Sequence, residues 1–202
     1  MSNETKIVDL LMGTKREGME NLLNWMNDNG FFTAPCSGGN HLAEEGGLME
    51  HSLNVLDLMD DIYNGGKLDE DTTIQPDSII ICALLHDLGK CGDHGKANYV
   101  PNMIKDGRPT KAEPEQKYKQ SEDKPFKANP ELMYVPHEVR SVAIAERFIS
   151  LTEDEEWAIL MHNGLYGDFR YGIQGKETPL YLLLHFADMW ASRVLEVEKQ
   201  PE

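Results

Sequence analysis

The residues of this sequence that most clearly could do chemistry are a histidine and an aspartate standing side by side, His86 and Asp87. They follow directly on the apolar run 79–85, which is typical of a buried element. An ionisable group in an apolar setting is costly unless it is paired, so both side chains need a partner. One divalent transition metal ion (Mn, Fe, Co, Ni or Zn) would serve both, because imidazole and carboxylate are ordinary ligands of such ions. On this dipeptide alone, an ordinary ion pair or helix cap explains the two residues equally well.

The other histidines are further candidates for a metal site. The sequence contains seven: His41, His51, His86, His94, His137, His162 and His185. A lone helical histidine is usually a surface residue or a satisfied core residue. The prediction of a metal site therefore rests on the histidines taken together with their sequence surroundings, and not on any single histidine.

Hydrophobic periodicity predicts a mostly helical chain that would position these residues. The expected helices are 5–28, 48–64, 79–90, 137–150, 153–163 and 178–198. Asp77 or Ser78 could cap the third, and Thr152 with Glu155 three residues on predicts a capping box for the fifth. The apolar run 79–85 is rich in isoleucine and would also suit a buried strand, so helix and strand both stay open there.

The segment 91–136 breaks the helical pattern. It contains six prolines and no sustained periodicity, and a loop this long is usually functional or disordered. A short hairpin around Asp106 and Gly107 would fit it. The segment holds eight basic and seven acidic residues, whereas the whole chain has a net charge of −16. It could receive a small anion, or it is simply a solvated loop of mixed charge.

Three ordered motifs resemble the HD-domain superfamily of metal-dependent phosphohydrolases. The segment 83–90, ALLHDLGK, is similar to the family's His-Asp signature. The segment 46–53, GGLMEHSL, matches the setting of its upstream histidine, and 184–188, LHFAD, matches its late aspartate. The amino-acid sequence of these motifs is most similar to that of the HD domain of a bacterial 3′–5′ exoribonuclease. The resemblance implies one all-α HD-type helical bundle over 1–202, with an irregular insertion at about 91–136 that could carry a small β-hairpin.

The resemblance also implies roles for individual residues. The implied metal ligands are His51, His86, Asp87 and Asp188. His137 and His162 would face the substrate as general acid or base, or hold a second ion. Asn163 stands where relatives have a second histidine, which favours one tightly held ion and leaves Asn163 to touch the substrate.

Other positions carry weaker assignments. Lys90 resembles a lysine that contacts substrate phosphate, although a lysine at a helix end is also favoured by the helix dipole. His41 aligns loosely with a family histidine and stays a candidate, as does His94. His185 is expected in the core or behind the metal ligands.

The implied activity is hydrolysis of a phosphate ester or anhydride of a nucleotide or related small molecule. The ion would be a transition metal, with Mg²⁺ as a further option, and it would activate water. Two alternatives stay open: a 3′–5′ exonuclease on RNA or short oligonucleotides, and an inactive, metal-stabilised nucleotide-binding module.

The charge and composition of the chain limit the kinds of partner and compartment that are expected. The net charge of −16 disfavours long nucleic acid. No apolar run is long enough for a membrane span, and no secretory signal is recognisable. Cys36, Cys82 and Cys91 are an odd, sparse set without close spacing, which favours a reducing cytoplasm. Nothing in the sequence predicts the oligomeric state.

Overall fold

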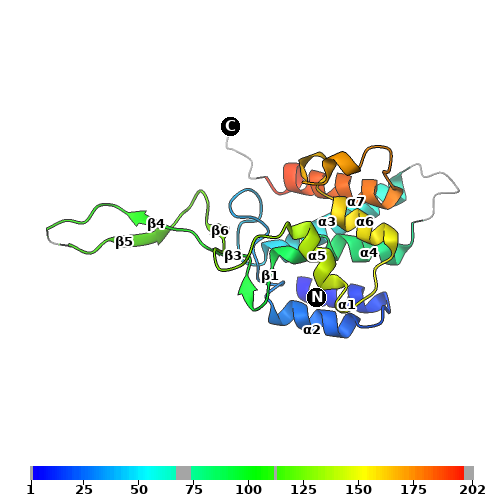
Figure 1. Cartoon of the computed structure of the whole chain (residues 1–202), viewed down its shortest axis with the longest axis horizontal. Helices are drawn as coiled ribbons and strands as arrows, with labels where there is room; N and C mark the ends of the chain where they lie inside the picture. The colour runs from blue at the N-terminus through cyan, green and yellow to red at the C-terminus, as the bar shows by residue number, and fades with distance from the viewer. Residues whose placement is uncertain (1, 67–73, 112, 198–202) are drawn as a thin grey trace.

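The computed structural model describes residues 2–66, 74–111 and 113–197, and these residues are mostly helical (Figure 1). The α-helices are α1 (Asn3–Gly13), α2 (Met19–Asp28), α3 (Gly47–Gly65), α4 (Pro76–Leu85), α5 (His137–Ala145), α6 (Glu153–Met161) and α7 (Pro179–Trp190). Short helical turns are η1 (Leu88–Lys90), η2 (Gly164–Tyr166), η3 (Arg170–Gly172) and the π-helical η4 (Ala191–Leu195). None of the described helices has the length and apolar character needed to cross a bilayer.

Helix α4 lies at the centre of the helical body. It packs against α1, α3, α6 and α7, and nearly all of its residues are buried. A helix that is apolar on every side needs such a central place, because no face of it is suited to water. The choice between helix and strand at 79–85 is thus decided in favour of helix.

Several expected helix boundaries were wrong: α5 ends at Ala145, and α7 ends at Trp190, after which η4 begins. Two further differences have a physical cause. The stretch 5–28 is two helices, because the chain turns at Gly18 with a φ of 85°. A Cβ atom there would collide with the carbonyl oxygen of Phe148, so only glycine fits. Helix α4 begins at Pro76 and ends at Leu85 instead of spanning 79–90. His86 and Asp87 therefore lie just beyond its C-terminal end, where their side chains can turn towards one point.

The insertion 91–136 forms three small antiparallel sheets: β1 (Gly92–Asp93) with β2 (Lys96–Ala97), β3 (Tyr99–Pro101) with β6 (Phe126–Ala128), and β4 (Met103–Asp106) with β5 (Lys117–Gln120). The pair β4–β5 projects from the body as an arm (Figure 1). The hairpin expected around Asp106 and Gly107 exists, but it is not a tight turn. Asp106 pairs with Lys117, so the strands are joined by residues 107–116.

The predicted capping box at the start of α6 is confirmed, and it ties several elements together. The Glu155 carboxylate, 0% exposed, accepts hydrogen bonds from the backbone N–H of Thr152 and the hydroxyl of Ser78. It also forms an ion pair with Arg16. Burial alone would raise the pKa of Glu155, but these partners hold it below its usual value. One buried charge thus joins α4, α6 and the turn after α1.

Replacing this charge should destabilise the fold in a pH-dependent way. We expect Glu155→Gln to lower the free energy of unfolding by about 3 kcal/mol at neutral pH, because it leaves Arg16 without its charge partner. The folded pKa of Glu155 lies below its ordinary 4.5, so this stability is present above that pH and is lost as the pH falls through the folded pKa.

Urea denaturation between pH 3 and 7 measures the effect, with the exposed neighbour change Glu156→Gln as control. A difference between wild type and Glu155→Gln that stays constant down to pH 3 would contradict this account.

Candidate metal centre

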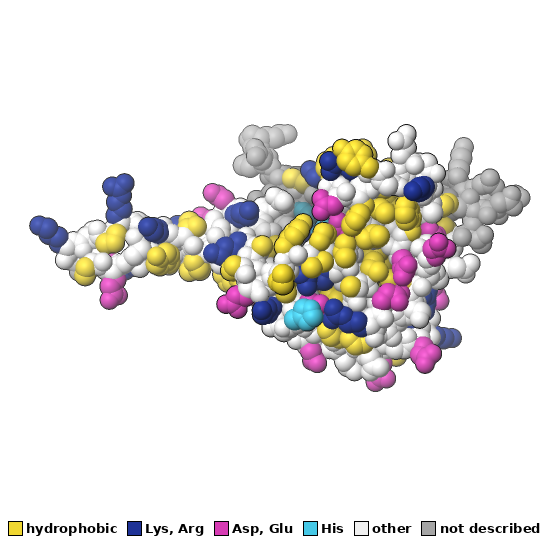
Figure 2. Space-filling view, in the orientation of Figure 1, with side chains coloured by type: hydrophobic (Ala, Val, Ile, Leu, Met, Phe, Trp, Pro, Cys, Tyr) yellow, Lys and Arg dark blue, Asp and Glu magenta, His cyan; other side chains and the backbone are white. Residues whose placement is uncertain are grey.

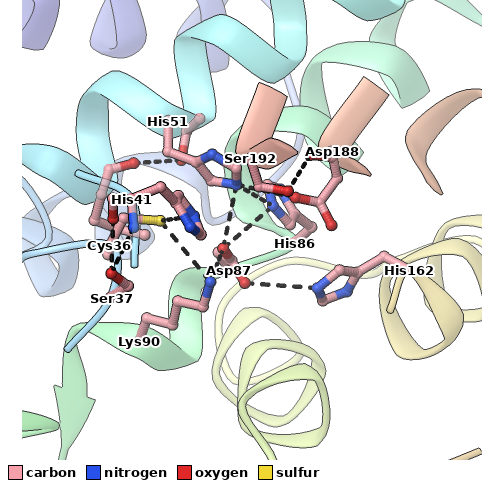
Figure 3. Close-up of polar contacts among 12 residues, drawn as sticks. Cys36, Ser37, His41, His51, His86, Asp87, Lys90, His162, Asp188 and Ser192 are labelled. Atoms are coloured by element: carbon pink, nitrogen blue, oxygen red, sulfur yellow. Dashed lines mark hydrogen bonds and ion pairs between the residues drawn. The ribbon is translucent and has the colours of Figure 1, made fainter. Parts of the chain in front are cut away.

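Polar side chains from several helices converge on one buried region around Asp87 (Figure 3). His51 comes from α3, His86 and Asp87 follow α4, His137 opens α5, His162 follows α6, and Asp188 lies in α7. The side chains of His51, His86 and Asp87 are at most 1% exposed, and that of Asp188 is 17% exposed. All six residues expected around a metal ion are therefore brought together.

The four expected ligands of a first ion lie within reach of a common point. His51 Nε2 lies 3.3 Å from His86 Nε2, 3.5 Å from Asp87 Oδ2 and 3.2 Å from Asp188 Oδ1. His86 Nε2 lies 3.4 Å from Asp87 Oδ2. Two imidazole nitrogens and two carboxylate oxygens are a donor set that suits a divalent transition metal.

Three of the histidines present the same nitrogen to this point. His86 Nδ1 donates to the carbonyl of Ala83 at 2.9 Å, and His162 Nδ1 donates to that of Ile159 at 2.7 Å. His51 Nδ1 lies 3.0 Å from both carboxylate oxygens of Glu196. Because these partners only accept hydrogen bonds, Nδ1 carries the hydrogen and Nε2 is left to coordinate.

A second group of possible ligands shares Asp87. Its Oδ1 lies 3.2 Å from His137 Nε2 and 3.6 Å from His162 Nε2, and these two nitrogens are 3.3 Å apart. The amide nitrogen of Asn163 lies 3.3 Å from His137 Nε2. Oδ2 thus faces the first group and Oδ1 the second. The buried clusters could hold a metal ion, and their geometry leaves its identity open.

The surroundings of the Asp87 carboxylate show whether the residues present suit a metal ion. Both of its oxygens are buried and neither has a hydrogen bond of acceptable angle among the described residues. Lys90 Nζ lies 2.6 Å from Oδ2 and acts as a charge partner. A buried carboxylate with free lone pairs is costly, and a cation among the surrounding nitrogens would satisfy it. The residues present therefore fit a divalent ion.

The electrostatics keep the carboxylates charged. Burial alone would raise the pKa of Asp87, but the charge of Lys90 and the neighbouring imidazoles of His86, His137 and His162 hold it well below its usual value. Asp188 behaves alike, because the neighbouring imidazoles, His51 first among them, outweigh the effect of its burial and lower its pKa. Burial lowers the pKa of His86, which favours the neutral imidazole that a metal requires.

Lys90 lies between this centre and a neighbouring buried pair, Cys36 and His41, of which the sequence had indicated only His41 as a candidate. Burial opposes its charge, but Asp87 and other acidic groups raise its pKa well above the ordinary value. Its Nζ is 3.8 Å from Sγ of Cys36, which in turn is 3.4 Å from His41 Nε2. Burial raises the pKa of Cys36 to about 11, and burial with the charge of Lys90 lowers that of His41 to about 4. Cys36 and His41 thus stay neutral beside the charged centre.

Glu196 is the functional candidate that the sequence analysis missed. Its side chain is 2% exposed, contacts His51 as described above, and accepts a hydrogen bond from Asn54 at 2.9 Å. Eight residues beyond Asp188, a regular α-helix would turn this position about 80° away from that aspartate. The π-helical turn η4 intervenes and ends the helix at Leu195. Helical spacing therefore offered no signal for Glu196.

The remaining histidines lie outside the set of ligands. His185 Nδ1 donates to the carbonyl of His162 at 2.7 Å, so it supports that segment from behind, as expected. The side chain of His94 is 75% exposed, on the turn between β1 and β2. His94 thus has no part in the centre.

A cavity of about 510 Å³ opens over the centre. Its lining includes His41, Lys90, His162, Asn163, Asp188 and Arg193. Ligand cavities of proteins commonly measure about 300–1,000 Å³. The polar lining and two cationic side chains suit a small anion. Comparison with protein-family models, curated proteins and solved structures finds no match to this chain.

The contact of Glu196 with His51 predicts an effect on metal binding. We expect Glu196→Gln to weaken the affinity for Mn²⁺ or Zn²⁺ by about 10- to 100-fold, because an outer carboxylate orients the imidazole and increases its basicity. Competition with a chelating dye measures the affinity, and the exposed change Glu20→Gln serves as control. An affinity equal to that of the wild type would show that Glu196 does not support a metal ligand.

Proposed function

We propose that this chain is an HD-type, metal-dependent phosphohydrolase acting on a nucleotide or a related small phosphate compound. The observation that carries the proposal is the doubly shared Asp87, which faces His51 and His86 with one oxygen and His137 and His162 with the other. The order of the ligands along the chain also resembles the HD superfamily. The helical bundle, the ligand order and the polar cavity support the same assignment.

In this proposal His51, His86, Asp87 and Asp188 hold the ion. A bound divalent ion offsets the charge of a phosphate group and lowers the pKa of water from 15.7 towards about 7. The three anchored Nδ1 hydrogens keep their imidazoles from rotating, so the donor atoms are in place before the ion arrives. Such preorganisation lowers the cost of assembling the centre.

The other cavity residues act on the substrate. Lys90, charged and only 15% exposed, is placed to offset negative charge on phosphoryl oxygens. His162 lines the cavity, and its Nε2 lies 3.3 Å from that of His137, so this pair can give or take a proton there. The amide of Asn163 can hydrogen bond a substrate oxygen. Arg193 lies over the ring of Tyr166 at 5.1 Å, and the exposed ring is available for stacking with a base.

The catalytic proposal is tested by hydrolysis with resolved products. We expect the Mn²⁺-loaded wild type to turn over at least one member of a panel of nucleoside mono- and triphosphates, cyclic nucleotides and a short oligonucleotide. Asp87→Asn should reduce that turnover by about 1,000-fold or more, because it removes the shared charge. Asp77→Asn, an exposed change in the first turn of α4, should leave it unaltered.

The product names the bond that is cut, and cleavage of the oligonucleotide alone would favour the exonuclease alternative. Full activity of a folded Asp87→Asn protein would overturn the mechanism. Tight nucleotide binding by the metal-loaded wild type without any turnover would favour the inactive binding module instead.

The number of ions provides an independent test at Asn163. We expect the wild type to retain one tightly bound ion, because an amide is a poor ligand for a transition metal. Asn163→His places an imidazole next to His137 and His162 and should raise the retained metal towards two ions. Elemental analysis after dialysis measures this number. Two ions in the wild type, or one in Asn163→His, would contradict the proposed role of Asn163.

A further inference from the structure

A second cavity lies next to the one above the metal centre. It measures about 400 Å³, and its lining includes Tyr99, Lys124 and Lys127. Gly39 and Asn40 line both cavities, so one short turn forms a common wall. The second cavity lies where β3 and β6 join the arm to the helical body, and the function proposed above makes no use of it.

This wall is built by close packing of the turn against the base of the arm. The backbone N–H of Phe126 donates to the carbonyl of Gly38 at 3.1 Å. A Cβ atom on Gly38 would lie 3.0 Å from the carbonyl oxygen of Phe126, and one on Gly39 would lie 3.0 Å from Cα of Lys124. Such tight approaches fit glycine best. The base of the arm is therefore held in place relative to the turn that borders the metal centre.

Tyr99 adds a polar group to the second cavity. Its side chain belongs to the lining of that cavity, together with Lys124 and Lys127. Burial raises the pKa of Tyr99, although the charge of Lys90 opposes this, so the hydroxyl keeps its hydrogen and can donate. The lining of the second cavity thus combines a hydrogen-bond donor with two lysines.

The charges in the lining of the second cavity favour an anion. Lys124 and Lys127 are exposed, and within the described residues neither ammonium group has a carboxylate within 4.0 Å. Asp123 is the one acidic residue of this lining. A further cavity that borders the same turn, about 450 Å³ in volume, has four acidic residues in its lining, Glu44, Glu122, Asp123 and Glu196. Figure 2 shows Lys and Arg side chains along the arm and where it meets the body.

We propose that the cavity at the base of the arm binds a second phosphate of the substrate, through Lys124, Lys127 and Tyr99. The inference rests on the proposed function, because it places the reacting phosphate at Lys90 and the metal centre. The second phosphate belongs either to a polyphosphate chain or to the next nucleotide of a short oligonucleotide. The acidic cavity would repel that group, so the substrate extends from the metal centre towards the arm and not away from it.

Calorimetric binding to the Mn²⁺-loaded full chain tests this subsite without relying on turnover. The probes are a nucleoside monophosphate, a methylene-bridged nucleoside diphosphate and a 5′-phosphorylated, phosphorothioate-linked dinucleotide. The variant is the double change Lys124→Gln and Lys127→Gln. The matched control is Lys105→Gln with Arg108→Gln, which alters the total charge equally but lies further out on the arm.

We expect the wild type to bind at least one of the two-phosphate probes about 10-fold or more tightly than the monophosphate, as charge-assisted contacts would provide. The Lys124/Lys127 variant should lose this gain and bind the monophosphate within about 2-fold of the wild type. The control should keep the gain. The probe that shows the gain identifies the source of the second phosphate.

Two outcomes would overturn the subsite while leaving the proposed function intact. In the first, both two-phosphate probes bind no more tightly than a well-bound monophosphate. In the second, the variant and its control lose affinity equally, which would indicate a general electrostatic attraction instead of a local site. Failure of all three probes to bind would instead overturn the proposed function together with the subsite.

Discussion

The structure depends most on how the negative charge of one buried carboxylate, that of Asp87, is balanced. Lys90 pairs with one of its oxygens, and histidines surround both, yet neither oxygen has a well-aligned hydrogen bond among the described residues. An ionised carboxylate in such a place is tolerated only where positive charge is close. The buried side chains around Asp87 could hold a cation, which would satisfy this carboxylate.

The arrangement of helices follows from this requirement. Helix α4 is apolar on every side and therefore central, and it ends at Leu85, just where the polar pair begins. The ends of α4 and α6 and the start of α5 bring His86, His162 and His137 to the two oxygens of Asp87. The carbonyls of Ala83 and Ile159, one turn back in their helices, anchor His86 and His162. The backbone thus both delivers the ligands and sets their tautomers.

Much of this was predictable from residue types and order, and the rest was not for physical reasons. His51, His86, Asp87 and Asp188 were expected together because three ordered motifs resemble a known family, and they lie together in the structure. Glu196 escaped prediction because a π-helical turn changes its direction. The break at Gly18 depends on a contact with Phe148, which is distant in sequence. The strand pairing of the arm likewise depends on contacts that local periodicity does not encode.

The central claim is that these side chains bind a divalent ion directly. X-ray absorption at the metal edge tests it most closely, on full-length protein loaded with one equivalent of Mn²⁺ or Zn²⁺. The account predicts a coordination shell that includes imidazole nitrogens as well as oxygens, with the imidazole signal reduced in His86→Ala. A spectrum of the fully hydrated ion, or an imidazole signal unchanged in a folded His86→Ala protein, would contradict it.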